Sequence, residues 1–257
     1  MKVVILAGGL PSTLKQDEKI PKPMAEIGGR PILWHIMKQY AYYGYTEFII
    51  CTGYKGEMIK DYFMNFYIYQ SDITVDLQTN QVEVHRKKTE SWDVIVADTG
   101  RDASASERIL SVREYLKRDT FLVTYGDCVS DMDISDMVAQ HKKEGKLATF
   151  AVAKPTGRNK IIPVDHNGVI KRSGTADNRP NAWVNACSMV FEQGVFQYLK
   201  GDEALLEEEM LNRLSAEGGT SLYRHNGFWT PMETVRDKTL LESMWKQEKA
   251  PWKVWED

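Results

Sequence analysis

Short apolar runs alternate with helical patterns through the first 150 residues of the chain. Each run is apolar at consecutive positions, which is typical of strands that are buried on both faces of a parallel sheet. The runs lie at residues 3–7, 47–52, 120–125 and 148–152. Because parallel neighbours need a crossover connection that is usually a helix, this alternation predicts a doubly wound, mostly parallel α/β sheet.

Proline and glycine mark the ends of the clearest helix. Pro31 opens a segment with apolar residues at helical spacing and Gly44 closes it, as proline does in a first turn and glycine just after a last one. The same reading predicts helices at 106–118 and 134–144. It then predicts a strand at 183–191, helices within 194–216, a strand at 220–224 and a last helix at 234–247.

Two stretches alternate apolar and polar residues instead. They lie at 75–86, around Thr79 and Asn80, and at 161–171, around residues 165–168. This pattern predicts antiparallel hairpins inserted into the sheet.

We expect one domain over residues 1–257, in which 192–257 forms a C-terminal helical subregion. Three tryptophans there are a candidate subunit contact, so we expect a homo-oligomer: Trp245, Trp252 and Trp255.

The charge balance excludes several classes of partner. Thirty-three Lys and Arg against 36 Asp and Glu give a net charge of -3, which provides no basic field for a nucleic-acid backbone or an anionic membrane. No stretch approaches the roughly 20 apolar residues of a membrane span. The three cysteines have neither disulfide-framework nor metal-ligand spacing. We therefore expect a cytoplasmic protein that binds neither nucleic acid nor membrane.

A glycine pair and a constrained lysine are the first candidate site. Gly8 and Gly9 follow the first predicted strand, and Lys22 stands between two prolines. Ligands of open α/β sheets bind outside the carboxyl ends of the strands, where paired glycines let a phosphate approach the backbone. The motif is neither a dinucleotide fingerprint nor a P-loop. Taken alone it fits a phosphate site and a plain tight turn equally well.

Carboxylates provide the second candidate site. Asp127 follows a buried strand, where it would face the same crevice, and Mg²⁺ prefers one or two such oxygens together with substrate phosphates. Asp131 and Asp133 are expected to cap the helix that begins near Ile134. Glu233 stands at the start of the last helix, where it either interacts with the helix dipole or, given a partner across the crevice, holds a metal. No Ser, Cys or His has the context of a covalent nucleophile.

Together these residues resemble the sugar-phosphate nucleotidyltransferases, and within them the glucose-1-phosphate cytidylyltransferase branch. The resemblance covers nearly the whole chain and is strongest at 1–10, 22–37, 124–127 and 227–238. It implies a Rossmann-like nucleotidyltransferase fold. It also implies that an oxygen of a sugar 1-phosphate attacks the α-phosphate of CTP, that pyrophosphate leaves, and that two acidic residues hold Mg²⁺.

The resemblance assigns roles residue by residue. The catalytic candidates are Lys22 at a phosphate, Arg108 near the nucleotide and Asp127 at the metal, with Glu233 as the second metal ligand. The candidates for binding CTP and the phosphorylated acceptor are Leu6, Ala7, Gly8, Gly9, Leu10, Ser12, Thr13, Gly126 and Asn185.

Several positions depart from the family pattern. Thr13 stands where the family has an arginine that clamps the triphosphate, and Glu107 brings a negative charge near the nucleotide. Where the family reads Asn-Gly-Gly-Phe, this chain has Asn185-Ala186-Cys187-Ser188, and the lysine for the sugar phosphate has no obvious counterpart. Three hypotheses follow: CMP transfer to glucose 1-phosphate, CMP transfer to another phosphorylated acceptor, and a subunit that binds nucleotide or supports assembly without catalysis.

Overall fold

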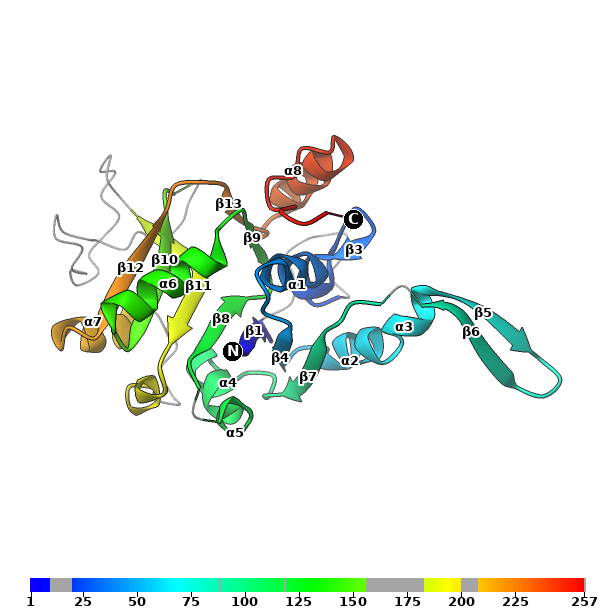
Figure 1. The fold of residues 1–257 in the computed structure, drawn as a ribbon, viewed down its shortest axis with the longest axis horizontal. Helices are drawn as coiled ribbons and strands as arrows, with labels where there is room; N and C mark the ends of the chain where they lie inside the picture. The colour runs from blue at the N-terminus through cyan, green and yellow to red at the C-terminus, as the bar shows by residue number, and fades with distance from the viewer. Residues whose placement is uncertain (10–19, 88, 118, 156–182, 200–207, 257) are drawn as a thin grey trace.

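A central sheet organises the protein. The computed structural model describes residues 1–9, 20–87, 89–117, 119–155, 183–199 and 208–256. Within them, seven strands form one sheet in the order β12-β10-β11-β8-β1-β4-β7 (Figure 1). The strands are β1 (Val3–Ala7), β4 (Glu47–Thr52), β7 (Asp93–Asp98), β8 (Phe121–Tyr125), β10 (Ala148–Ala153), β11 (Val184–Phe191) and β12 (Thr220–His225).

One strand of this sheet runs against the others. β11 pairs antiparallel with both β8 and β10, whereas the remaining neighbours pair in parallel. The carboxyl ends of β1, β8, β10 and β12 therefore lie at one edge of the sheet, and β11 begins at that edge. The mostly parallel α/β sheet that the sequence predicts is confirmed.

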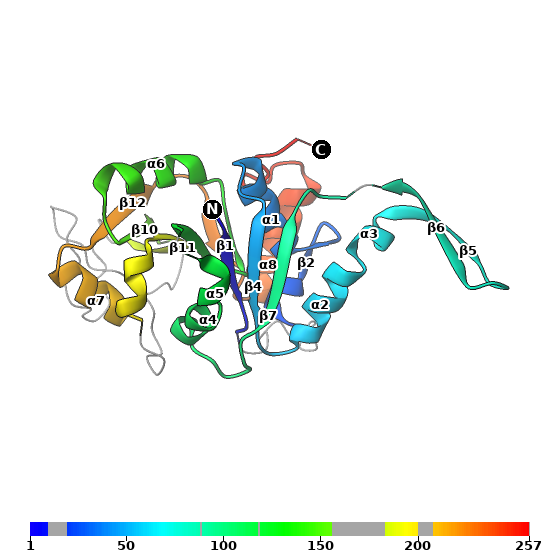
Figure 2. The ribbon, with the colours of Figure 1, turned by 60° about the horizontal axis from the view of Figure 1, so that its bottom comes forward.

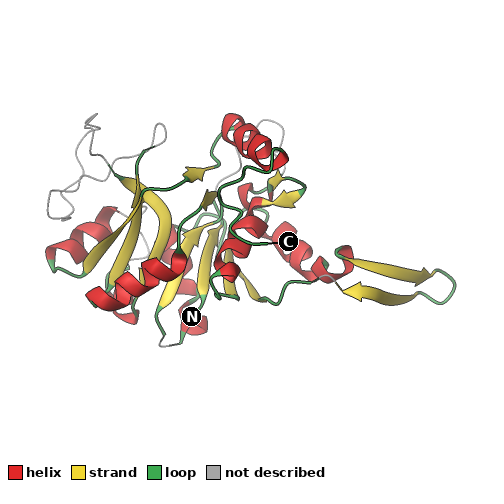
Figure 3. Ribbon diagram, turned by 45° about the horizontal axis from the view of Figure 1, so that its top comes forward, coloured by secondary structure: helices red, strands yellow, loops and turns green. Residues whose placement is uncertain are grey.

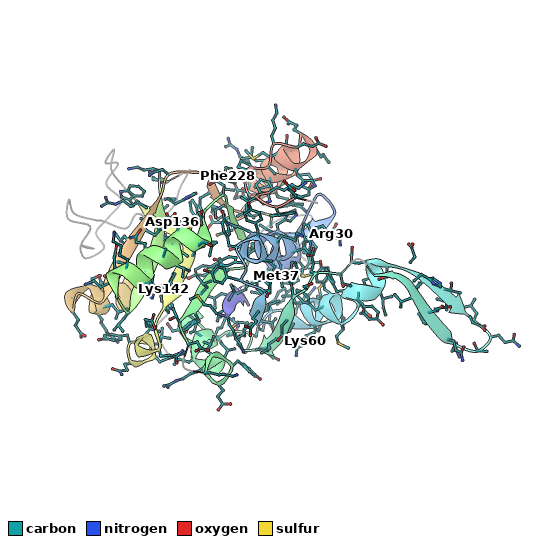
Figure 4. The ribbon with its side chains drawn as sticks, in the orientation of Figure 1. Arg30, Met37, Lys60, Asp136, Lys142 and Phe228 are labelled. Atoms are coloured by element: carbon teal, nitrogen blue, oxygen red, sulfur yellow. The ribbon has the colours of Figure 1, made fainter. Side chains whose placement is uncertain are left out.

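Each face of the sheet has its own core, because successive strand residues point to opposite faces. Val3 and Ile5 contribute to one core and Val4 and Leu6 to the other. The first core is covered by α1 (Ile32–Tyr42), α6 (Ile134–Glu144) and α8 (Val235–Lys246). The second is covered by α4 (Ala105–Ser111), α5 (Arg113–Leu116), η2 (Gln193–Gln197) and α7 (Glu208–Ala216) (Figure 2). Met37 of α1 is fully buried in the first (Figure 4).

Local signals determine the helix ends. α1 begins directly after Pro31, and α6 has Asp133 as its N-cap and Gly145, at φ 60°, as its C-cap. The helix predicted at 106–118 is instead two helices separated at Val112, and the first begins one residue earlier because Ser104 and Glu107 form a capping box. None of the helices in the described ranges has the length and apolar character that crossing a membrane requires.

A two-stranded hairpin stands away from the body of the protein (Figures 1 and 3). It consists of β5 (Ser71–Asp76) and β6 (Gln81–Lys87), follows α2 (Gly56–Met64) and α3 (Phe66–Tyr69), and turns at Asn80, which has φ 55°. The alternation at 75–86 thus predicted it correctly, while the hairpin predicted at 161–171 lies outside the described residues. Because Val75 pairs with Val82 and Ile73 with Val84, one face of the hairpin is apolar.

The C-terminal tryptophans belong to the protomer's own core. Trp252 is fully buried and Trp255 nearly so, and both pack with His35 of α1. Trp245 is half-buried and packs edge-on to the same histidine at a ring distance of 4.6 Å. The expectation that these three rings form a subunit contact is therefore wrong for Trp252 and Trp255, since their apolar surface is already covered within the chain.

Candidate active site

A cavity of about 550 Å³ opens at the carboxyl ends of β1 and β8. Among the described residues it is lined by Leu6, Ala7, Gly8, Gly9, Lys22, Pro23, Arg101, Asp102, Ala103, Ala105, Arg108, Tyr125, Gly126 and Asp127. The strand ends thus bring the glycine pair, the constrained lysine and the carboxylate of the sequence prediction into one crevice. Leu10, Ser12 and Thr13 lie outside the described residues.

Lys22 and Asp127 face each other in this cavity. Lys22 opens the short helix η1 (Lys22–Met24) after Pro21, and its ammonium lies 3.6 Å from the Asp127 carboxylate. Gly126 lets the two segments approach, because a Cβ there would lie 3.0 Å from Cγ of Pro23. Each of the paired side chains keeps about a quarter of its surface exposed, 26% and 25%. A ligand in the cavity can therefore reach both charges.

Arg108 also reaches this cavity, but its guanidinium is already occupied. It is 4% exposed, and its terminal nitrogens donate to the carbonyl oxygens of Gly8 at 2.7 Å, Thr52 at 2.9 Å and Gly100 at 2.8 Å. Further bonds go to the Thr99 hydroxyl and the Arg101 carbonyl. Arg108 thus ties the glycine loop to the ends of β4 and β7, whereas the sequence predicts a catalytic contact with the nucleotide.

The Arg108 guanidinium explains why position 8 is a glycine. A Cβ at Gly8 would overlap the guanidinium, whereas a Cβ at Gly9 would meet no atom of the described residues within 4 Å. Gly8 is therefore required by packing under the loop, and Gly9 is the glycine that leaves the backbone open toward the cavity.

Glu233 follows a strand that pairs next to Asp127, but it does not line the cavity. β13 (Trp229–Pro231) pairs antiparallel with β9 (Cys128–Ser130), and the Met232 N–H donates to the Asp127 carbonyl at 2.8 Å. Glu233, the next residue, is exposed and is not among the lining residues. The described residues contain no group of three or more His, Cys, Asp or Glu placed to hold a metal. A cation at Asp127 would therefore need oxygens from its substrates.

Asn185, a predicted binding residue, is not among the residues that line the cavity and lies in a distorted part of β11. The register against β10 shifts between Phe150 and Val152, and Cys187 in this bulge has φ 65°, a left-handed conformation that is rare outside glycine. The Asn185 side chain accepts from the Cys187 N–H at 2.8 Å. Its amide nitrogen is buried and has no hydrogen-bond partner within the described ranges.

The structure also gives Glu107 a capping role and makes Cys128 a poor nucleophile. Glu107 closes the capping box of α4 by accepting from the Ser104 N–H at 2.6 Å, and it is not among the residues that line the cavity. The Cys128 thiol lies 3.7 Å from the Asp127 carboxylate, but burial raises the pKa of this thiol well above its ordinary value. It stays protonated and is a poor nucleophile.

Sequence analysis missed the wall formed by Arg101, Asp102 and Ala103. These residues follow β7, which we did not predict. The signal was present, because residues 94–97 form an apolar run like those of the other buried strands.

The chain matches the nucleotidyl transferase family over residues 2–230. It is 43% identical over 258 residues to glucose-1-phosphate cytidylyltransferase of Salmonella typhimurium, with 100% of both chains covered. HddC from Yersinia pseudotuberculosis complexed with GMP-PN has a similar structure, with a TM-score of 0.73 at 17% identity, covering 95% of this chain and 99% of that one. Apo-UDP-glucose pyrophosphorylase gives 0.73 at 13%, covering 97% and 99%. At these identities the two structures support the fold alone.

Proposed function

The chain belongs to the nucleotidyl transferase family, and on that premise we propose that it transfers CMP from CTP to a sugar 1-phosphate, with glucose 1-phosphate as the first candidate. The observation that carries the proposal is the full-length identity of 43% to a glucose-1-phosphate cytidylyltransferase. The convergence of Gly9, Lys22 and Asp127 on one cavity supports it independently.

The reaction is a displacement at phosphorus. A phosphate oxygen of the acceptor forms a bond to the α-phosphorus of CTP, the bond from that phosphorus to the bridging oxygen breaks, and pyrophosphate leaves with the electron pair. Such a step needs alignment and charge neutralisation rather than a covalent intermediate. This requirement agrees with a site that offers an open backbone, a cation and a carboxylate, and in which none of the described lining residues is an activated nucleophile.

Lys22 and Asp127 have separate roles in this proposal. The Lys22 ammonium contacts phosphate and offsets the charge that develops there. Asp127 would hold Mg²⁺, and Glu233 is the candidate for the second ligand. When bound, Mg²⁺ neutralises phosphate charge and aligns the reacting groups. The donor set fits, since Mg²⁺ commonly uses one or two carboxylates together with phosphate oxygens.

Arg108 acts as a positioning residue. Its bonds to Gly8 and to the ends of β4 and β7 hold the backbone against which the nucleotide lies.

We also propose that the protein works in the cytoplasm, since Cys51, Cys128 and Cys187 are all free thiols. Assembly as a homo-oligomer is supported by the exposed apolar side chains of the hairpin, Ile73, Val75 and Val82.

The test is pyrophosphate release from CTP, ATP, UTP, GTP and dTTP with Mg²⁺, against a panel of sugar 1-phosphates and non-sugar phosphates. We expect release with CTP and glucose 1-phosphate, and a product with the mass of CDP-glucose. Release only with another acceptor would correct the substrate. CTP binding without release from any pair would overturn the proposal and favour a nucleotide-binding subunit.

A further inference from the structure

Three side chains gather at the catalytic edge of the sheet, outside the cavity described above. Lys154 follows β10, Trp183 directly precedes β11, and Arg224 lies near the end of β12. The Lys154 ammonium lies 4.2 Å from the centre of the Trp183 ring, and the Arg224 guanidinium lies 5.8 Å from it. The electron-rich face of one indole thus holds two cations.

Strand register explains this grouping. Ala153 pairs with Val184 and Val152 pairs with Arg224, so Lys154 lies across from Trp183 and shares the face of the sheet to which Arg224 belongs. Asn185 is two residues after Trp183 and therefore lies on the same face. This face presents two cations and an amide nitrogen without a hydrogen-bond partner in the described ranges.

Neither cation is neutralised within the part of the chain that the structure describes. Lys154 and Arg224 are exposed and take part in no ion pair or hydrogen bond with any described residue. Two like charges beside one ring repel each other, and an anion between them would remove that repulsion. The group has the chemistry of an anion site.

The position of Lys154 and Arg224 relative to Asp127 indicates which substrate they would bind. β11 separates β8 from β10, so Lys154 lies two strands from Asp127, about 10 Å across the sheet. The nucleotide cavity extends the other way, toward β1 and β7. A molecule that enters beside Asp127 from the β11 side therefore passes Asn185 before it reaches Lys154 and Arg224.

We propose that Lys154 and Arg224, held on Trp183, bind an anionic group of the acceptor. This proposal rests on the proposed function, because it requires an acceptor that is brought against CTP. The acceptor must place its own negative charge beside the triphosphate, and two cations on its far side offset that repulsion. The anionic group that binds to the two cations is either the phosphate that every sugar 1-phosphate carries or a further carboxylate of the acceptor.

The experiment compares steady-state kinetics of Lys154→Gln, Arg224→Gln and the double variant with those of the unchanged protein. We expect each single change to raise KM for glucose 1-phosphate roughly 10-fold, as loss of a charged contact does, while KM for CTP stays within twofold. Trp183→Leu should act like the single changes, and Trp183→Phe, which keeps a ring, should be milder. Lys142→Gln on α6, exposed and remote from this edge, is the matched control (Figure 4).

Two acceptors distinguish the sources of the anion. An equal rise in KM for glucose 1-phosphate and glucuronic acid 1-phosphate assigns the site to the shared phosphate. A rise for glucuronic acid 1-phosphate alone assigns it to the added carboxylate. Unchanged KM for both acceptors, with normal turnover by the unchanged protein, would overturn this proposal and leave the proposed function standing.

A protein without turnover would contradict the proposed function instead. In that case, calorimetric titration of glucose 1-phosphate and of glucuronic acid 1-phosphate into the unchanged protein and the double variant still tests the site. Equal heats from the two proteins with both acceptors would overturn it.

Discussion

The Lys22 ammonium and the Asp127 carboxylate form an ion pair in the cavity at the ends of β1 and β8, with a nitrogen-to-oxygen distance of 3.6 Å. They come from segments more than 100 residues apart, and each remains partly open to solvent. The pair keeps two opposite charges close together without substrate. On the proposed function, a phosphate would contact the lysine while a cation would contact the carboxylate.

Replacing the carboxylate should remove the activity and keep the fold. For Asp127→Asn we expect a 100- to 1,000-fold loss of kcat, which is roughly the effect of losing one positioned charged group. The measurement is pyrophosphate release with CTP and glucose 1-phosphate, with circular dichroism to follow folding. Asp61→Asn, on the exposed side of α2, is the matched control. An Asp127→Asn protein with full activity would remove this residue from the metal site.

Replacing Lys22 should slow the same reaction, because its positive charge would no longer offset the charge of the phosphates. We expect Lys22→Met to lower kcat/KM for CTP roughly 100-fold, because a charged donor is lost where phosphate charge must be offset. Lys22→Arg should recover part of that loss, since it restores the charge with a different shape. Lys60→Met on α2 controls for general charge effects (Figure 4). Equal losses in Lys22→Met and Lys60→Met would contradict a specific role.

Arg108 should matter for stability before it matters for chemistry. Arg108→Met leaves the buried Gly8 carbonyl oxygen without the guanidinium donor, whereas the Thr52 carbonyl keeps its bonds from Thr99 and the exposed Gly100 can turn to water. For one unsatisfied buried acceptor, the free energy of unfolding should fall by about 1–3 kcal/mol, measured by urea denaturation. Arg101→Met is the control, because Arg101 lines the same cavity but is exposed. A stable Arg108→Met protein without activity would instead favour direct contact with the nucleotide.

His35 should make the protein less stable in acid. Burial lowers the pKa of this side chain from 6.5 to about 4. Its Nε2 lies 2.9 Å from the Ile27 carbonyl, to which it donates, and its Nδ1 accepts from the Trp252 indole at 3.4 Å, so a second proton would oppose that donor.

Above pH 6.5 the histidine is neutral in both folded and unfolded chains. As the pH falls from 6.5 toward 4, only the unfolded chain gains the proton, so about 3 kcal/mol of stability is lost over that range. Urea denaturation at a series of pH values measures this loss. His35→Gln should flatten the profile between pH 6.5 and 4, and His85→Gln on the exposed hairpin should not. An unchanged slope in His35→Gln would assign the acid sensitivity to other groups.

The C-terminal tryptophans should be as important as any other part of the core. Trp252 is fully buried between α1 and α8, and Trp252→Ala should reduce the free energy of unfolding by about 3–5 kcal/mol. Tyr69→Ala, which removes a ring that is 72% exposed, should cost far less. Similar losses for the two variants would contradict the packing described here.

Local chemistry explains what could be read from the sequence. Pro31, Gly44 and Asn80 each mark one helix end or one turn, because the conformational preference of a single residue determines the structure there. The alternation of apolar runs was sufficient to predict the parallel sheet. Gly8 and Asp127 could be placed at one edge because each follows the end of a predicted strand, whereas the role of Lys22 came from the resemblance to the family.

Contacts between distant residues explain what was missed. Nothing near Arg108 in the sequence indicates that its guanidinium serves the Gly8 carbonyl, 100 positions away. The tryptophans were taken for exposed surface because their partner, His35, lies in the first helix. β7 was missed although its apolar run was visible, and with it one wall of the cavity.

The bond between His35 and Trp252 joins residues 217 positions apart. At ordinary rates of synthesis, roughly 10 to 40 s separate the appearance of these two side chains. During that interval the three C-terminal tryptophans are not yet present to cover the face of α1 that carries His35. A chain arrested before residue 245 would lack all three rings, and we expect it to leave this part of the apolar core open to water and to chaperones.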